Sequence, residues 1–323
     1  MAWETGTAAN HVDLFNKIRD FLTTNTDLVN AGENWTQVLG PSGTLVHGDQ
    51  ITLKGPGLTG TDAVYCGMET LENPGADTYN IRFWGHSGFS VNLEPRLQPL
   101  LSPDQYVLLW DQPMTYWIIG NGRRWMLVVK VSTVYSSAYC GFFLPYASPT
   151  EYPYPMMVAG ISPGDQRWSS QDQRNRFMAS PGYNTMFVYY PDNVWRRVAN
   201  YQNDSNTPSP IYGNSVVASA YMFPTRDYSA APGIRAVNSE VTTDQMTKCF
   251  DGSYIMRDLT IMGSGAGNSG PYDAMIGVLD GVFWVPGREN SSENTISRDS
   301  VDHLVVQNLH RTGFRDYMAM RLA

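Results

Sequence analysis

Two apolar runs separated by an Asn-Gly pair constrain the fold of this chain most strongly. They lie in residues 115–131, on either side of Asn121-Gly122. Asn-Gly is the preferred centre of a type I′ hairpin turn, because both central residues need a positive φ. A two-residue loop would pair Trp117 with Met126 and leave both faces of the hairpin apolar. We therefore predict a strand pair buried on both sides, by a second sheet, a helix or a neighbouring subunit.

The rest of the chain predicts many short strands and one helix. Asn10 can cap a helix that ends near Asn25, since apolar residues recur at helical spacing between them. After it, short runs with period-two alternation are separated by turn sequences such as Asn73-Pro74-Gly75. We predict a mainly β fold of antiparallel β-sandwich-like sheets with one N-terminal amphipathic helix. The expected strands are 35–39, 49–54, 63–71, 79–84, 115–119, 124–131, 135–146, 185–190, 216–223, 253–262, 274–279, 281–285 and 303–309.

The segment Tyr152-Pro153-Tyr154-Pro155 predicts a connector, because alternating prolines remove the donors that a central strand needs. The chain then divides into residues 1–148, the helix with a sandwich-like region, and residues 149–323, a second β-rich region. The two regions either share one core or have separate cores. A polar loop over residues 162–182, which contains Trp168, is long enough to predict a contact-making role.

Composition disfavours several functional classes. The net charge is −8, so the chain is a poor candidate for binding nucleic acid. It contains no apolar stretch of about 20 residues, and its first residues lack a signal-peptide pattern. We expect no membrane insertion and folding in a cytoplasm. Cys66 and Cys140 lie in apolar runs and are expected to be small buried side chains rather than disulfide or zinc ligands.

The sequence shows no catalytic or cofactor-binding pattern. Gly263-Ser264-Gly265 does not extend to a dinucleotide motif, and no other phosphate, zinc-protease or hydrolase motif is present. His303 and His310 would lie on opposite faces of one strand, so they cannot share a metal ion. We expect no enzyme activity, no cofactor and no metal. An enzyme would require two close carboxylates, for which the candidates are Asp104 with Asp111 or Asp251 with Asp258.

Residue usage instead resembles that of protein interfaces. Charged residues make up only 16% of the chain, and four of the 22 basic residues are Lys while the others are Arg. Aromatic residues, Met and Arg are enriched at interfaces, where Lys and Glu are depleted. This usage predicts a homo-oligomer. The candidate interface residues are Trp117, Met126, Tyr152, Tyr154 and Trp168.

Several blocks along the chain resemble one protein family. They comprise residues 3–8 and 11–14, residues 115–124, 130–135 and 142–146 running into 152–155, and residues 280–285, 293–296, 305–308 and 311–312. In this order they resemble virion structural proteins of tailed bacteriophages. The resemblance implies a particle component of the neck, collar or tail that folds in the host cytoplasm. It implies no catalytic residue.

Two functions follow as expectations. The first is a virion structural protein that assembles into a symmetric oligomer with itself and with other phage proteins, at the neck, collar, tail or baseplate. The alternative is a receptor- or glycan-binding protein at the tail tip or baseplate, which would expose an aromatic groove to solvent.

Overall fold

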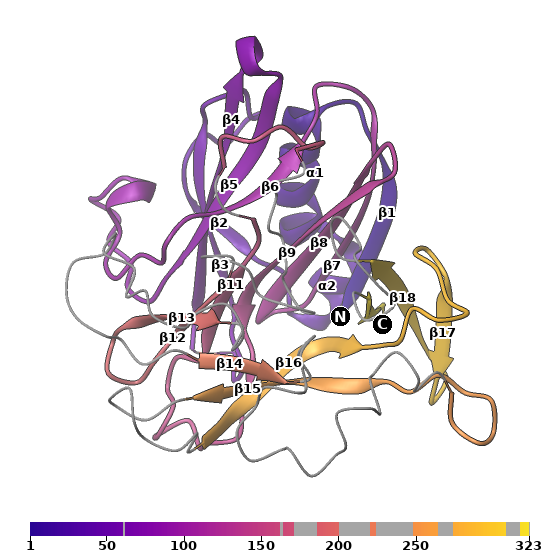
Figure 1. The fold of residues 1–323 in the computed structure, drawn as a ribbon. Coiled ribbons are helices and arrows are strands. Elements are labelled where there is room, and N and C mark those ends of the chain that lie inside the picture. Colours follow the sequence, from indigo (N-terminus) through magenta and orange to yellow (C-terminus); the bar gives the residue numbers. More distant parts are fainter. Residues whose placement is uncertain are drawn as a thin grey trace, which may run out of the picture.

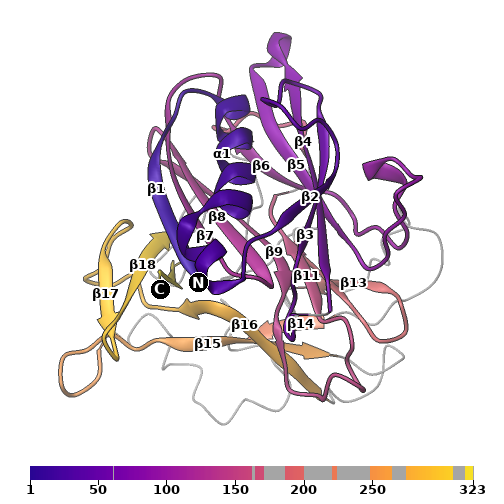
Figure 2. The same ribbon diagram turned by 180° about the vertical axis from the view of Figure 1, so that it is seen from behind.

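A computed structural model describes residues 1–60, 62–161, 164–170, 186–199, 220–223, 248–263, 274–307 and 317–322. These residues form two largely antiparallel sheets and an N-terminal pair of helices, so the predicted fold class is confirmed (Figures 1 and 2). No helix in the described ranges is both long and apolar enough to cross a membrane. The predicted loop at 162–182 lies mostly outside the described residues, as does the glycine-rich sequence that follows Gly263.

The strands belong to a smaller and a larger sheet. The smaller sheet runs in chain order through β2 (Thr36–Leu39), β3 (Gln50–Gly55), β4 (Val64–Asn73), β5 (Thr78–His86) and β6 (Gln105–Leu109). The larger sheet has the order β1 (Ala2–Ala8), β7 (Met114–Gly120), β8 (Arg124–Val131), β9 (Val134–Phe142), β11 (Met156–Ala159), β12 (Met186–Tyr189), β13 (Trp195–Ala199), β14 (Ala220–Phe223), β15 (Arg257–Gly263), β16 (Ala274–Trp284), β19 (Tyr317–Arg321), β18 (Val301–Gln307) and β17 (Thr295–Arg298). The short β10 (Leu144–Pro145) pairs with β16.

The predicted helix is α1 (His11–Thr24), which is followed by α2 (Thr26–Ala31). The Asn10 side chain accepts a hydrogen bond from the backbone N of Asp13, and the Asp13 carboxylate accepts one from the backbone N of Ala9. This reciprocal pair satisfies two donors at the helix start. The buried apolar face of α1 consists of Leu14, Phe15, Ile18, Phe21 and Leu22.

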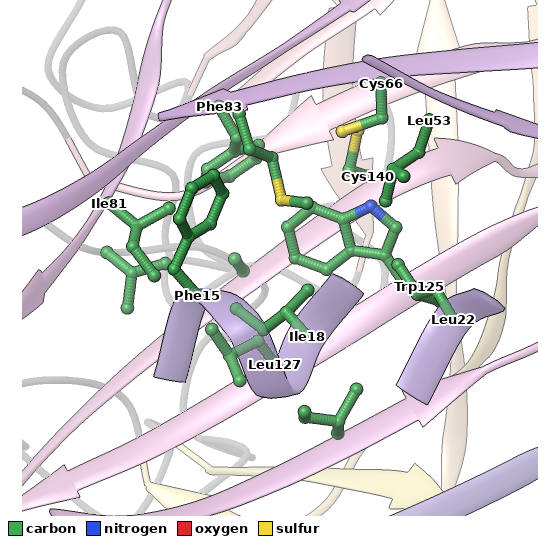
Figure 3. Close-up of a cluster of buried hydrophobic side chains, with 14 of the residues drawn as sticks. Phe15, Ile18, Leu22, Leu53, Cys66, Ile81, Phe83, Trp125, Leu127 and Cys140 are labelled. Atoms are coloured by element: carbon green, nitrogen blue, oxygen red, sulfur yellow. The ribbon is translucent and has the colours of Figure 1, made fainter. Parts of the chain in front are cut away.

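Strands β7, β8 and β9 form the middle layer of the molecule. One of their faces packs against α1 and the smaller sheet, in a core that includes Trp125 and Leu127 (Figure 3). In the same core the buried sulfur atoms of Cys66 and Cys140 lie 3.2 Å apart, as free cysteines of opposing sheets. The opposite face packs against β15, β16, β18 and β19 in a second core that includes Met126. The predicted burial of both hairpin faces is confirmed, by layers of the same chain.

The hairpin turn differs from its prediction. Trp117 pairs with Val128 rather than with Met126, and neither Asn121 nor Gly122 has a positive φ, so the predicted type I′ turn was wrong. The Asn121 side chain accepts hydrogen bonds from the backbone N atoms of Arg123 and Arg124, at 3.0 Å each, which makes an Asx turn. The observed register of the two strands differs from the predicted one by two residues. Each side chain of the hairpin therefore still points to the face of the sheet that was predicted for it.

The larger sheet crosses the predicted boundary at residue 148. Strand β9 pairs with β11, and β10 pairs with β16, so regions 1–148 and 149–323 contribute neighbouring strands to one sheet. The second core also contains side chains from both regions. The connector at residues 152–155 therefore leads from one strand of this sheet to the next.

A buried charge cluster joins the hairpin tip to β16. The Asp280 carboxylate lies 2.8 Å from Nε of Arg123 and 3.2 Å from Nε of Arg124, and the Asn121 side chain donates to it at 2.8 Å. The side chain of Arg124 is fully buried. Although burial raises the pKa of Asp280, the charges of Arg124 and Arg123 and the Asn121 hydrogen bond outweigh it and hold the pKa at about 2.

This low pKa predicts an acid-sensitive contribution to stability. The pKa of Asp280 is lower in the folded chain than its ordinary value of 3.8, so its contribution is fully present above about pH 4 and is lost as the pH falls through about 2. We expect Asp280→Asn to remove on the order of 2 kcal/mol of this pH dependence, as measured by urea denaturation between pH 7 and pH 2. The exposed control Asp299→Asn should leave the wild-type pH profile unchanged. Equal profiles for wild type and Asp280→Asn would contradict the assignment.

The second core predicts a large truncation cost. Met126 is fully buried, so Met126→Ala should destabilise the fold by about 2–5 kcal/mol through lost burial and an unfilled cavity. Chemical denaturation of the isolated chain measures this. Met275→Ala, the same change at an exposed methionine, should cost under about 1 kcal/mol.

Candidate assembly surface

A long loop between β5 and β6, residues 87–104, projects from the body of the molecule. It is the purple loop at the left of Figure 1, and it projects on the opposite side in the reverse view of Figure 2. The loop exposes four aliphatic side chains within ten residues: Val91 is 69% exposed, Leu93 38%, Leu97 61% and Leu100 49%. Single exposed apolar residues are ordinary, whereas a cluster of this kind marks a contact surface.

One polar side chain of the loop points inward, whereas Asn92 and Glu94 are exposed. Gln98 is buried, and its amide nitrogen donates to the carbonyl oxygens of Ser90 at 2.9 Å and Leu93 at 2.8 Å. Its amide oxygen accepts from the backbone N of Ser90 at 2.8 Å. The buried amide of Gln98 therefore holds the backbone of the loop, while the four aliphatic side chains stay exposed to solvent.

Two indole rings attach the loop to its surroundings. The Trp84 ring donates to the carbonyl oxygen of Pro95 at 3.1 Å, and the guanidinium of Arg96 lies 4.7 Å from the centre of the same ring. Arg96 also forms a bidentate ion pair with Asp104 at the end of the loop. The Trp195 ring donates to the carbonyl oxygen of Leu100 at 2.8 Å. These contacts fix the outward direction of the aliphatic side chains.

The base of the loop is closed by a buried histidine. His86 donates from Nδ1 to the carbonyl oxygen of Gly88 at 2.6 Å, and its ring stacks on Tyr65. Burial lowers the pKa of His86 to about 4, against a smaller opposing effect of the Gly88 hydrogen bond. The ring is therefore neutral at physiological pH, and the loop base does not change its charge there.

A hollow lies on the other side of the molecule. It has a volume of ≈ 450 Å³, and its lining includes Tyr254, Met256, Ile296 and Arg298. These residues belong to β17 or lie just before β15, and Figures 1 and 2 show β17 on the side opposite the 87–104 loop. Phe250, which is fully exposed, belongs to the turn that borders the hollow. One chain therefore carries an apolar projection and an open, partly apolar hollow on opposite sides.

The residues that the sequence singled out as interface candidates lie largely inside the chain. Trp117, Met126 and Tyr152 belong to the second core, and the Tyr152 hydroxyl donates to the carbonyl oxygen of Tyr189 at 2.6 Å. Tyr154 and Trp168 are partly buried against the first core. Their subunit contact stays a prediction.

The 87–104 loop escaped the sequence analysis for a physical reason. Leu93, Leu97 and Leu100 have helical spacing, but Pro95 and Pro99 lie within the run and rule out a continuous helix. Periodicity therefore predicts no regular element here, and it does not report which side chains of an irregular loop face solvent.

Comparison with known proteins adds no relative. No protein-family model and no curated protein matches this chain.

The hydrogen bonds of Gln98 predict how the loop can be loosened. Gln98→Ala removes the hydrogen bonds of a buried amide to the carbonyl oxygens of Ser90, Leu93 and Glu94, so we expect a loss of about 1–3 kcal/mol and faster proteolysis within residues 87–104. Limited proteolysis with mass mapping measures the second effect. Gln37→Ala, which removes a surface amide bonded to Pro41, should leave the cleavage pattern unchanged.

Proposed function

We propose that this protein is a structural subunit of a tailed-phage virion that assembles head to tail with copies of itself. The 87–104 loop of one copy would occupy the hollow of the next. The observation that carries the proposal is this loop, in which the buried Gln98 side chain holds the backbone and four aliphatic side chains are exposed.

Burial of these side chains supplies a driving force for association. A Val or Leu side chain that moves from water into a contact contributes roughly 1.5–3 kcal/mol. The inward hydrogen bonds of Gln98 pre-organise the loop, so little conformational entropy is lost on binding. A second copy is the occupant that we propose, because the hollow lies on the opposite side of the same chain. Contacts between two different surfaces of one subunit generate a closed ring or a filament.

Residue usage supports the same function. The low charged fraction and the excess of Arg over Lys are typical of surfaces that other proteins cover. The family resemblance of the blocks around residues 115–155 and 280–312 supports a place in the neck, collar or tail of the particle. The proposed localisation is accordingly the virion, after folding in the host cytoplasm.

No specific observation favours the receptor- or glycan-binding alternative. Among the described residues the exposed aromatic side chains are Trp3, Tyr146 and Phe250, which lie on three separate elements. Glycan binding therefore stays a prediction from the sequence.

The self-association test introduces negative charges into the proposed contact between two copies of the chain. The double variant Val91→Asp/Leu97→Asp should remain monomeric under conditions in which the wild-type chain forms a closed oligomer, as measured by analytical ultracentrifugation. Both side chains are exposed, so its circular dichroism and melting temperature should match the wild type. Val29→Asp, a charge at the exposed face of α2, is the matched control and should assemble normally. A wild-type chain that stays monomeric at every concentration, or a double variant that still assembles, would reject the proposed contact.

A reconstruction of the phage particle tests the virion assignment separately. A ring of this chain at the neck or along the tail supports the proposal. A chain that projects from the tail tip with aromatic rings facing solvent supports receptor binding instead. Absence of the chain from purified particles would exclude both.

A further inference from the structure

Three residues that are distant in the sequence meet where α1 begins. His11 is the first residue of α1, His47 lies in the loop before β3, and Glu72 lies near the end of β4. One donor atom from each lies within 4.8 Å of the other two. Nε2 of His11 is 2.8 Å, and Nδ1 of His47 is 3.4 Å, from Oε1 of Glu72. Ligands of a tetrahedral zinc ion are separated by about 3.4 Å, as follows from bonds of roughly 2.0–2.1 Å.

The neighbours of His11 leave one nitrogen unmatched. Its side chain is only 2% exposed, and Nδ1 is buried without a hydrogen-bond partner. The nearest carboxylate to Nδ1 is Asp111, at 4.0 Å. If Nε2 of a neutral ring donates to Glu72, Nδ1 carries a lone pair that faces this carboxylate. Two acceptors then face each other, which is unfavourable.

A cation at Nε2 removes this mismatch. A metal ion takes the lone pair of Nε2, so the single proton of the neutral ring moves to Nδ1 and points toward Asp111. Metal-bound histidines usually have such a carboxylate partner on their second nitrogen.

The charges around the cluster also favour a cation. Neither Glu72 nor Asp111 pairs with a Lys or Arg among the described residues. These two negative charges lie beside the imidazole rings of His11 and His47. They offset the positive end of the α1 dipole, which by itself would disfavour a cation. The loop that carries His47 is held to α1, because the Asn16 side chain donates to the carbonyl oxygen of Leu45 and accepts from its backbone N, both at 2.9 Å.

We propose that His11, His47 and Glu72 bind one divalent transition-metal ion of the zinc class, with Asp111 orienting His11. Two imidazoles and one carboxylate are borderline ligands that select zinc over magnesium or calcium. The side chains of His47 and Glu72 are partly exposed, so the ion has an entry path and a coordination position open to water. The ion would clamp the start of α1 and the loop that carries His47 to the smaller sheet.

The test uses the full-length chain after treatment with a chelator. Titration with Zn²⁺ should show one bound ion per chain, and Co²⁺ should give the visible absorption of a four-coordinate site. His47→Ala and Glu72→Gln should each weaken Zn²⁺ binding at least about tenfold. Zn²⁺ should raise the melting temperature of the wild type and not that of His47→Ala.

Two controls distinguish loss of this metal site from unfolding and from metal binding at another histidine. His47 is 44% exposed, so His47→Ala should fold normally, and its melting temperature without metal checks this. His303→Gln changes a histidine of β18, outside this cluster, and should bind Zn²⁺ like the wild type. Failure of the wild type to retain one equivalent of Zn²⁺, or equal affinity of the wild type and His47→Ala, would overturn the proposal.

Discussion

Burial of the β7–β9 layer on both faces is the constraint on which the rest of the structure depends. Alternate residues of these strands point into two cores, so neither core can form without the hairpin. α1 and the smaller sheet cover one face, while β15, β16, β18 and β19 cover the other. A sheet that is apolar on both sides needs layers on both sides, which explains why one large sheet contains strands from both halves of the chain.

The charge cluster at the hairpin tip connects these layers through polar contacts. Asp280 lies in β16, whereas Arg123 and Arg124 lie at the tip, more than 150 positions away in the sequence. Gly281 has a φ of +72°, and an added Cβ would lie 2.7 Å from a terminal nitrogen of Arg124. The chain can therefore approach the buried guanidinium closely only because glycine follows Asp280. Loss of one partner would leave an uncompensated buried charge.

The proposed functional features lie outside this rigid centre. The 87–104 loop and the hollow near β17 occupy opposite sides, which suits head-to-tail contact between copies. The histidine cluster lies at the start of α1, where a bound ion would clamp a loop to the smaller sheet without using the assembly surface. The proposed assembly surface and the proposed metal site thus use different residues of the chain and can be tested independently.

The sequence by itself determined the class of fold and the location of its centre. The cap at Asn10, the period-two runs and the apolar residues 115–131 predicted the helix, the strands and the doubly buried hairpin, because each signal is local. Only the tertiary structure decided the turn at Asn121, whose side chain accepts hydrogen bonds from the backbone N atoms of Arg123 and Arg124. It also decided the outward surface of the 87–104 loop. It alone brought His11 to Glu72 and Cys66 to Cys140, since such contacts depend on how distant strands pack, and no local pattern of residues records that packing.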